Sequence, residues 1–531
     1  MTSQQNLVRT VRSTIRHNAS RPALLDADRR LTWQEFGSRV AKLAGAMQVK
    51  GIGAGRRYAI VSRNGFRTEE LKWAGFWLGA IPILINWRLA AAEIAPILAD
   101  AECVHVFAES TFAGLFEDPA LIGWSDRTTI FGNANGANAA VYEDLIASSQ
   151  PAAAADPAPD SDAIVIYTGG TTGRSKGVRL SHANILANAL AFGLGVGARR
   201  DDVYLHAAPM FHSADLLALP WMLQGAPQCY LPAFSPSAFL ELIASHRVGA
   251  VITVPSMLIA TLSNPAFATA DLSSLRLLIY GAAPMSVEWI DRVSAALPHV
   301  ALLNCYGLTE TAPDLTIFAA DEFRAAIERM RATGDRTGPL MSVGKPNLLN
   351  EIRVIDKNGR EVGPGICGEI VARGPNMMQG YLNLPDETRT ALQDGWFHTG
   401  DVGYIDDAGY VYLVDRMKDM VISGGENVYS TEVEAALHRH PEIAEAAVVG
   451  VPDEVLGEAV VAALVAKPTA QPSPDELARH CRSLIGGFKV PKQFIFVDTL
   501  PKSALGKVLK SSLRQQIAAR AKAAAEPRTA A

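Results

Sequence analysis

The sequence predicts a mixed α/β protein with more than one domain. Two stretches, 31–100 and 249–285, alternate helix-like segments with short apolar runs, and this alternation is typical of βαβ units and a mostly parallel sheet. Beyond about residue 340, short strands separated by frequent glycines indicate an antiparallel β subdomain. A chain of 531 residues has room for about three domains. We expect a large layered α/β N-terminal domain with a β subdomain, followed by a small α+β domain.

The elements of the first domain follow from the spacing of apolar residues. Residues 31–50 predict an amphipathic helix, because Trp33, Phe36 and Val40 recur at helical spacing. A connector rich in proline and alanine, 150–161, precedes the most informative part of the chain. Buried strands are expected at 58–61, 81–85, 162–167, 250–254 and 275–280.

A compact α+β segment is expected to begin after Asp415. The chain then divides into an N-terminal domain over 1–415 and a C-terminal domain over 416–531. A helix of the second domain opens at Thr431, because Thr431 and Glu434 have the spacing of a capping box ahead of an apolar run.

Composition and charge exclude several classes of protein. Hydrophobic residues make up 49% and charged residues 19% of the chain, which excludes disorder for most of it. The net charge of -5 leaves the chain as a whole without a basic field for nucleic acid. The sequence has no run of about 18 apolar residues, so no transmembrane helix is expected. The cysteines lack the spacing of a disulfide framework or a zinc site, so a reducing, cytoplasmic location is expected; they are Cys103, Cys229, Cys305, Cys367 and Cys481.

A loop rich in glycine and threonine follows the strand expected at 162–167. Its glycines would let the backbone approach a polyanion, and its hydroxyls and Lys176 would donate hydrogen bonds to phosphate oxygens. It lacks the spacing of a Walker A loop. The alternative is a glycine-rich surface turn. The residues concerned are Thr168, Gly169, Gly170, Thr171, Thr172, Gly173 and Lys176.

This loop resembles the phosphate loop of the adenylate-forming enzymes, a family of acyl-CoA synthetases, carrier-protein loading domains and firefly-type luciferases. It differs from the usual pattern in having Gly169 in place of serine and Ser175 in place of proline. Four further motifs match in the family's order, and 281–284 resembles the family's adenine-side loop. The four motifs lie at 304–311, 394–401, 415–427 and 501–507.

The resemblance implies ATP and coenzyme A as substrates and Mg²⁺ as the metal. The phosphate loop, Gly281, Ala282, Ala283 and Tyr306 would bind the nucleotide. By the same resemblance Thr309 contacts the α-phosphate, Glu310 and Thr172 hold the metal, Asp401 and Arg416 bind the ribose or a phosphate, and Lys507 catalyses adenylation.

The resemblance also implies a second step, in which a thiol attacks the adenylate. In the family the small domain is a mobile lid that rotates about a hinge between the steps, and the hinge residue here is Lys418. Gly424 and Gly425 would line the channel for the pantetheine arm. His212 matches a position between the acyl pocket and this channel, with a packed polar residue as the alternative.

The acyl pocket implied by the resemblance is mostly apolar. Its lining candidates are Trp221, Val254, Met257, Gly281 and Leu315, together with two acids, Asp215 and Asp314. One of the acids could accept a hydrogen bond from a substrate hydroxyl, while the alternative is an acid at the surface or at a helix cap. An aromatic, hydroxyaromatic or medium-chain fatty acid is the expected substrate.

Three classes of function remain in competition. An AMP-forming acyl-CoA synthetase is favoured, because the chain carries no carrier-protein domain. An adenylation enzyme that loads a separate carrier protein is the first alternative, and a paralogue that only senses nucleotide is the second. No nucleic-acid partner is expected, the chain itself is not expected to span a membrane, and a homodimer is left open.

Overall fold

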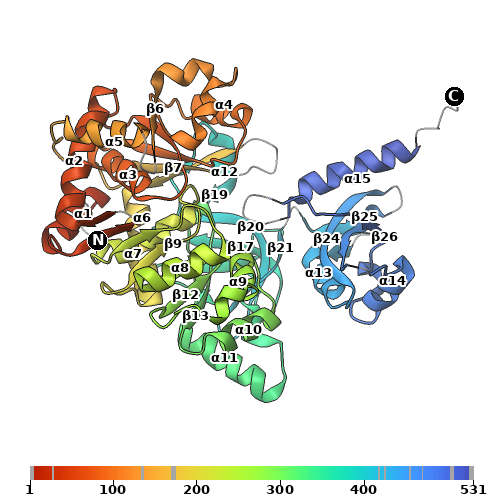
Figure 1. The fold of residues 1–531 in the computed structure, drawn as a ribbon. Coiled ribbons are helices and arrows are strands. Elements are labelled where there is room, and N and C mark those ends of the chain that lie inside the picture. Colours follow the sequence, from red (N-terminus) through yellow and green to blue (C-terminus); the bar gives the residue numbers. More distant parts are fainter. Residues whose placement is uncertain are drawn as a thin grey trace. The chain divides into compact units, whose positions relative to one another are not determined.

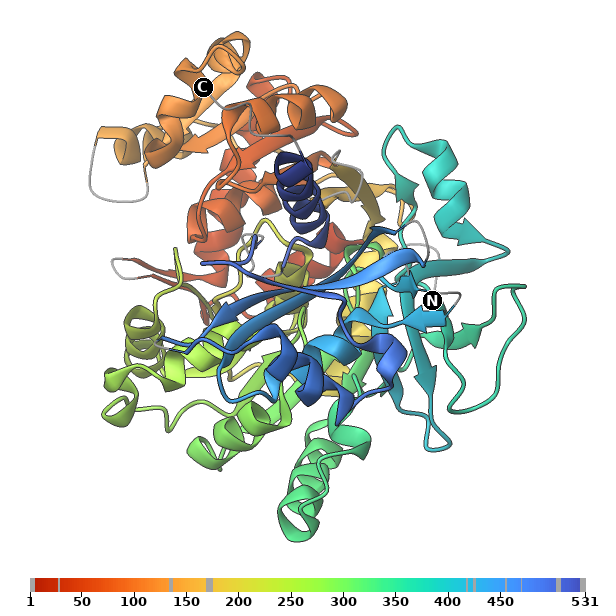
Figure 2. The ribbon, with the colours of Figure 1, turned by 90° about the vertical axis from the view of Figure 1, so that its right-hand side faces the viewer.

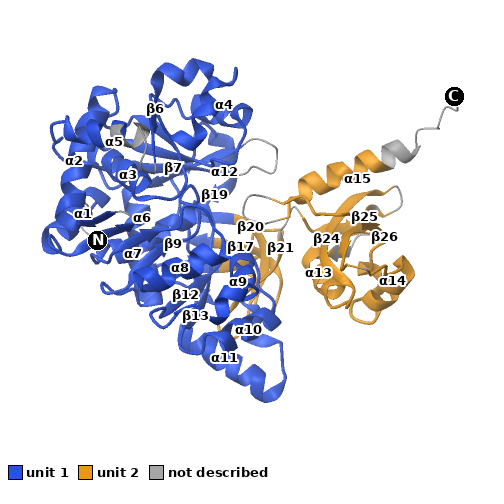
Figure 3. Ribbon diagram, viewed as in Figure 1, with its two compact units in different colours: residues 1–352, 372–398 blue, residues 353–371, 399–531 orange. Residues whose placement is uncertain are grey.

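The computed structural model describes residues 5–26, 29–132, 137–168, 175–416, 419–423, 426–453, 456–468, 470–502 and 508–525. Helices and strands are mixed along the whole chain, so the predicted α/β class is confirmed (Figure 1). The chain forms two compact units, one of residues 1–352 and 372–398 and the other of residues 353–371 and 399–531 (Figure 3). The domain boundary expected at 415/416 stays a prediction.

A seven-stranded sheet forms one core of the first unit. Tyr58 and Ile60 pack against the helices α1, α2, α3 and α6, whereas Ala59 and Val61 face α4, because successive side chains of a strand point to opposite faces. The strands, in spatial order, are β18 (Gly380–Tyr381), β8 (Lys176–Ser181), β7 (Asp162–Thr168), β4 (Ile81–Ile85), β3 (Arg57–Val61), β5 (Val106–Glu109) and β6 (Thr128–Phe131). The helices are α1 (Leu7–His17), α2 (Trp33–Val49), α3 (Phe66–Leu78), α4 (Ala91–Asp100) and α6 (His182–Val196).

A nine-stranded sheet forms the second core of this unit. Helix α6 lies between the two sheets, because its Leu186 packs into the first core and its Phe192 into the second. The strands, in spatial order, are β15 (Lys345–Pro346), β14 (Thr316–Phe318), β13 (Ala301–Tyr306), β12 (Leu277–Tyr280), β11 (Val248–Thr253), β9 (Val203–His206), β10 (Gln228–Tyr230), β1 (Pro22–Asp26) and β2 (Arg29–Thr32). The nine-stranded sheet pairs in parallel at its centre and antiparallel at both edges, whereas the seven-stranded sheet is antiparallel only at its β18–β8–β7 edge and parallel through to β6.

Further helices complete the first unit. They are α5 (Ala137–Ala147), α7 (Leu219–Leu223), α8 (Pro236–His246), α9 (Pro255–Leu262), α10 (Val287–Ala296), α11 (Ala320–Thr333) and α12 (Pro385–Ala391). Two short 3-10 turns, η3 (Ser213–Ala218) and η5 (Thr309–Thr311), carry residues of the candidate site.

Short strands form the β subdomain expected beyond residue 340. They are β16 (Glu351–Ile355), β17 (Gly368–Arg373), β19 (Leu392–Gln393), β20 (Trp396–Ile405) and β21 (Val411–Arg416). Strand β20 pairs antiparallel with both β19 and β21, so the antiparallel pairing predicted there is confirmed. The boundaries between the two units fall within β16, β17 and β20.

The C-terminal part of the second unit is built on a long antiparallel pair of strands, β24 (Ile443–Asp453) and β25 (Gly457–Ala466), seen as twisted blue ribbons in Figure 2. One face, with Val448 and Val460, packs against α13 (Ser430–His438) and α14 (Pro474–Arg482). The other face, with Val449 and Val461, packs against α15 (Lys510–Ala525). The remaining strands are β22 (Val421–Ser423), β23 (Glu426–Val428) and β26 (Gln493–Phe496).

The predicted capping box at Thr431 is wrong. Helix α13 begins at Ser430, and its N-cap residue Tyr429 makes no side-chain capping bond. Thr431 instead donates to the carbonyl of Val414, and Glu434 accepts from the backbone of Val448. Tertiary partners have replaced the local ones.

The other predicted elements are found close to their expected places. The helix expected over 31–50 is α2, capped by Thr32. The strands expected at 58–61, 81–85, 162–167, 250–254 and 275–280 are β3, β4, β7, β11 and β12. In the part of the chain that the structure describes, no helix is long and apolar enough to cross a membrane.

Candidate functional site

Most of the predicted site residues of the first unit lie at one edge of the nine-stranded sheet. Strands β9, β11, β12 and β13 run parallel, and register pairs join Thr253 to Tyr280 and Tyr280 to Asn304. Their carboxyl ends therefore open on the same side of the sheet, where ligands bind in open α/β proteins. The segments that follow them carry His212 and Asp215, Val254, Gly281 to Ala283, and Tyr306 to Glu310.

Two glycines let the loops at this edge approach one another closely. A Cβ atom on Gly281 would lie 2.7 Å from the carbonyl oxygen of Cys305, and one on Gly307 would lie 1.9 Å from that of Pro313. Only glycine fits at such distances. Ala282 adopts a φ of +64°, and the side chains of Ala282 and Ala283 are exposed. The sequence therefore fixes how the adenine-side loop and the Tyr306 segment meet.

Glu310 is held from a distant part of the chain. Its carboxylate Oε1 accepts a hydrogen bond from the Tyr381 hydroxyl over 2.8 Å, and its carbonyl accepts from the backbone N–H of Met378 over 2.8 Å. Strand β18 pairs with β8, matching Tyr381 to Val178, and the Lys176 ammonium lies 4.9 Å from the centre of the Tyr381 ring. Tyr381 thus joins the predicted phosphate lysine to the predicted metal ligand.

Thr309 meets the segment that carries His212. The hydroxyls of Thr309 and Ser213 lie 3.0 Å apart, within hydrogen-bond distance. Burial, with a smaller contribution from the positive charge of Arg88, lowers the pKa of His212 to about 4. The imidazole is therefore neutral at pH 7, and among the described residues its Nε2 has no hydrogen-bond partner.

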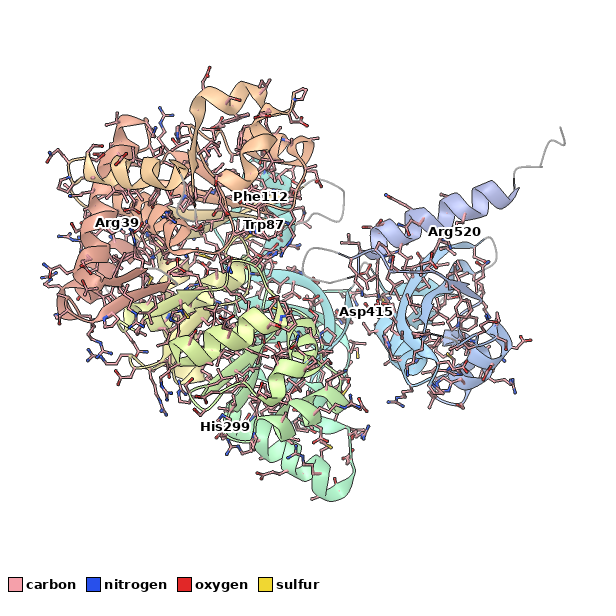
Figure 4. The ribbon with its side chains drawn as sticks, in the orientation of Figure 1. Arg39, Trp87, Phe112, His299, Asp415 and Arg520 are labelled. Carbon is pink, nitrogen blue, oxygen red and sulfur yellow. The ribbon has the colours of Figure 1, made fainter. Side chains whose placement is uncertain are left out.

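Aromatic side chains surround this histidine on one side. The Phe211 ring lies 4.4 Å from that of His212, centroid to centroid, and the Trp87 ring meets Phe211 edge-on at 6.5 Å. Trp87 also stacks on Phe112, and the two residues are labelled next to each other in Figure 4. The Arg88 guanidinium lies 4.2 Å from the Trp87 centroid. A neutral histidine therefore packs against the Phe211 ring, and the Arg88 charge is close enough to help lower its pKa.

The predicted apolar lining of the acyl pocket is largely covered. Trp221 is fully buried and donates to Asp202 over 2.9 Å, and Leu315 is fully buried as well. Met257 is buried, whereas Val254, at the end of β11, is half-buried. Contact of these residues with an acid stays a prediction.

The two acids predicted for this pocket lie in different surroundings. Each oxygen of Asp215 faces a nitrogen of a buried side chain: Oδ2 accepts from Lys72 at 2.6 Å, and Oδ1 lies 2.7 Å from His206 Nδ1. Asp314 accepts from the Asn347 side chain at 2.7 Å, and burial raises its pKa to about 8. Asp215 is therefore ionised and Asp314 mostly neutral at pH 7.

Within the second unit, Asp401 is buried on β20, and a register pair joins Asp401 to Arg416 on β21. Thr168 ends β7, and its hydroxyl donates to the carbonyl of Lys176 at 3.5 Å. Several predicted residues lie outside the described part of the chain: Gly169, Gly170, Thr171, Thr172, Gly173, Lys418, Gly424, Gly425 and Lys507, together with the side chain of Arg416.

Two residues of this site were not found from the sequence. Tyr381 and Ser213 carry no motif of their own, and their roles arise from the β8–β18 pairing and from the fold of η3 against η5. Only the proximity of Ser213 to His212 could have pointed to one of them.

Comparison with known proteins adds the family context. A profile described as "AMP-binding enzyme" matches residues 11–382, and one described as "AMP-binding enzyme C-terminal domain" matches residues 432–507. A feruloyl-CoA synthase of an Amycolatopsis species is 35% identical over 494 residues, covering 92% of this chain and 94% of the relative. The fatty acid–[acyl-carrier-protein] ligase ScoC of Streptomyces coeruleorubidus is 34% identical over 522 residues, 96% of each chain. The o-succinylbenzoate CoA synthetase MenE of Bacillus subtilis, solved with the acyl-adenylate intermediate OSB-AMP, matches with a TM-score of 0.82 at 27% identity, covering 96% of this chain and 98% of that one.

Proposed function

The chain belongs to the AMP-binding enzymes, and we propose that it joins an aromatic carboxylic acid to coenzyme A. It is an ATP-dependent acid–thiol ligase of the adenylate-forming family. It activates the acid as acyl-AMP with release of pyrophosphate, and then transfers the acyl group to CoA with release of AMP. The observation that carries the first step is the meeting of Thr309 and Glu310 with Ser213 and Tyr381 at the carboxyl edge of the sheet.

Adenylation solves the problem of a poor leaving group. A free carboxylate would have to expel oxide, whereas acyl-AMP expels AMP. Attack of the carboxylate on the α-phosphate concentrates negative charge, so catalysis consists mainly of positioning and of electrostatic stabilisation. Thr309 would donate its hydroxyl to the α-phosphate, with Ser213 fixing its orientation. Lys507, at about 4 Å in an effective dielectric of about 20, would supply about 4 kcal/mol, or roughly a thousandfold in rate.

The residues fit a magnesium ion carried by the nucleotide. The described residues contain no group of three side chains of metal-ligating type, and Mg²⁺ in ATP sites needs only one or two carboxylates besides the phosphates. Glu310, oriented by Tyr381, would supply a carboxylate, and Thr172 would supply a hydroxyl. When bound, Mg²⁺ offsets the charge of the pyrophosphate.

Thioester formation needs a different face of the C-terminal domain. A lysine placed over the acyl phosphate obstructs the thiol, so the domain would turn about Lys418 and bring Gly424 and Gly425 to the pantetheine channel. His212 would border this channel as a neutral side chain, because its pKa is far below 7. A neutral imidazole would place no positive charge beside the acyl group.

The aromatic acid is supported by two of the relatives. The feruloyl-CoA synthase and the o-succinylbenzoate CoA synthetase are both named for acids with an aromatic ring. Asp314 would recognise a hydroxyl on such an acid, and because it is mostly neutral it could also donate to that hydroxyl; the oxygens of Asp215 are already engaged by Lys72 and His206. A medium-chain fatty acid is the second candidate for the substrate.

One observation favours a second function. The ligase ScoC, which is named for transfer to an acyl carrier protein, covers this chain as fully as the CoA ligases do. Loading of a carrier protein in trans is therefore the alternative fate of the adenylate. A cytoplasmic location and a homodimer belong to the proposal as well.

The decisive experiment measures AMP release from Mg-ATP across benzoates, hydroxycinnamates and C4 to C16 fatty acids, with and without CoA. Acyl-CoA formed in step with AMP from an aromatic acid supports the proposal. Pyrophosphate exchange without any acyl-CoA points to a carrier protein instead. In the Lys507→Ala variant, adenylation should fall about a thousandfold while a preformed acyl-adenylate is still converted.

A further inference from the structure

A cluster of four ionisable side chains lies buried beside the loop that carries His212. Lys72 and Glu69 come from α3, Asp215 from η3, and His206 from the end of β9. None is more than 7% exposed. A cavity of about 20 Å³ borders the cluster, which is room for about one water molecule. Bulk solvent therefore does not screen these charges.

Hydrogen bonds hold the His206 ring from both sides. The Gln228 side-chain amide donates to the carbonyl of Ala226 over 2.9 Å, so its oxygen faces His206 Nε2 at 3.1 Å. Asp215 Oδ1 lies 2.7 Å from the other ring nitrogen, Nδ1. Both ring nitrogens of His206 are therefore engaged, and the ring is fixed against Asp215.

The Lys72 ammonium lies between the two carboxylates of the cluster. Lys72 lies 2.6 Å from Asp215 and 2.9 Å from Glu69. Burial alone would raise the pKa of Asp215, but the adjacent Lys72 and His206 outweigh burial and hold it below its ordinary value. Buried ion pairs add little net stability compared with apolar packing, yet removing one partner strands the other. Such a cluster is therefore better explained by a role in positioning the loop that carries His212.

The contact between His206 and Asp215 links the two ends of the loop that runs from one to the other. The backbone N–H of Asp215 donates to the carbonyl of His212 over 3.1 Å, and the neighbouring Ser213 contacts Thr309. Asn64 holds the first half of the loop, because its side chain bonds to the backbone of His206, Ala208 and Met210. Asp215 holds the second half, in which His212 and Ser213 lie.

We propose that Asp215 is a positioning residue for the acid side of the site. Paired with His206 and Lys72, it fixes the segment 211–215 and so holds His212 and Ser213 beside Thr309. The inference rests on the proposed function, in which Thr309 contacts the α-phosphate and His212 borders the acyl group. It assigns Asp215 an action through other residues, since both of its oxygens are already engaged.

The test compares two substitutions at the same position. In Asp215→Asn the new oxygen can accept from Lys72 and the new amide can donate to His206 Nδ1, so both contacts are kept without the charge. Asp215→Ala removes both contacts. We expect Asp215→Ala to raise the KM for the acid about tenfold or more while the KM for ATP changes by about twofold or less, and we expect Asp215→Asn to stay close to the unaltered enzyme.

A matched control removes a partly buried ion pair at the opposite end of β9. Arg276 pairs with Asp202 at 2.6 Å, just before that strand begins. Arg276→Gln should lower the melting temperature without changing the ratio of the two KM values. An unchanged acid KM in folded Asp215→Ala, or an equal rise in both KM values, overturns the proposal.

Two further measurements keep the test decisive. If Asp215→Ala does not fold, Ser213→Ala takes its place, because it leaves the buried charges intact and removes only the hydroxyl contact with Thr309. Its kcat for adenylation should fall about threefold; no fall would overturn the proposal. Amide hydrogen exchange over 207–214 needs no substrate and should accelerate in Asp215→Ala but not in Arg276→Gln. Inactivity of the unaltered enzyme with every acid would defeat the proposed function, whereas unchanged exchange would defeat this inference alone.

Discussion

The Tyr381 hydroxyl donates to the Glu310 carboxylate over 2.8 Å, although the two residues lie 71 positions apart in the chain. The pairing of β18 with β8 brings Tyr381 to this place and sets its ring 4.9 Å from the Lys176 ammonium. One side chain therefore orients the predicted metal ligand and packs against the predicted phosphate lysine. A carboxylate held in this way needs less reordering when it takes up a cation.

The Tyr381→Phe substitution should weaken the response to Mg²⁺. It removes the hydrogen bond that orients Glu310 but keeps the ring beside Lys176. A hydrogen bond to a charged group contributes about 1.5–3 kcal/mol, part of which water recovers at this half-buried site, so the Mg²⁺ concentration for half-maximal adenylation should rise about threefold to tenfold. Tyr412→Phe, which removes a hydroxyl bonded to Asp406, is the control. Equal Mg²⁺ dependence in both variants would contradict the assigned role of Tyr381.

Gly307→Ala should abolish activity through a local clash. The added methyl group would lie 1.9 Å from the carbonyl oxygen of Pro313 and 2.6 Å from its carbonyl carbon, so the backbone between Tyr306 and Thr309 must shift. A misplacement of about 1 Å at reacting groups costs about a hundredfold in rate. Gly123→Ala has no atom within 4 Å of the new methyl group and should keep full activity. Adenylation rates of the two purified variants decide the matter.

The buried acid Asp314 predicts a pH dependence of stability. Burial raises its pKa from 3.8 to about 8, against the opposing bond from Asn347. Between pH 4 and 8 the folded protein keeps a proton that the unfolded chain has released, so the stability from this group is full below pH 4 and is lost as the pH rises through 8. Asp314→Asn removes this titration and keeps the acceptor oxygen for Asn347.

Thermal or urea unfolding at pH 5.5 and pH 8.5 tests this prediction. The free energy of unfolding of Asp314→Asn, relative to the unaltered protein, should increase by about 3 kcal/mol between the two pH values. Asp202 is also buried but pairs with Arg276, so Asp202→Asn should show no such gain at high pH. A constant difference between Asp314→Asn and the unaltered protein would mean that Asp314 is ionised in the folded state.

The sequence predicted the elements whose information is local. Runs such as Ile81–Ile85 are apolar at every position, and the structure buries that strand completely, so periodicity alone was sufficient. The motif around Tyr306 was likewise found from its own residues, and the structure has it at the carboxyl end of β13. Local patterns also place Gly281, which follows directly after a predicted strand, and Val254, which ends one.

The relationships that local patterns missed are set by tertiary contacts. Thr431 and Glu434 have the spacing of a capping box, but their side chains have distant partners. Thr431 donates to the carbonyl of Val414, and Glu434 lies 2.8 Å from the Lys510 ammonium. Asp215 was expected at the acyl pocket, with an acid at the surface or at a helix cap as the alternative; no local pattern indicated its buried ion pair with Lys72, 143 positions away. No window of sequence contains both partners, and the fold alone decides which charges meet.

Lys418→Pro should separate the two half-reactions. Lys418 matches the family's hinge position and lies outside the described residues, so the prediction rests on the resemblance. Proline fixes φ near −65°, and a hinge must absorb a large change in backbone angles. Acyl-AMP formation should stay within about threefold, while thioester formation from bound acyl-AMP should fall about a hundredfold or more.

Single-turnover rates with and without CoA measure each half-reaction, and Lys418→Ala is the control. Alanine leaves φ free, so it should retain thioester formation while removing the same charge. If both half-reactions fell together in Lys418→Pro, the residue would act in folding or in binding rather than as a hinge. If Lys418→Ala lost thioester formation as well, the ammonium rather than backbone rotation would be the feature that the second step needs.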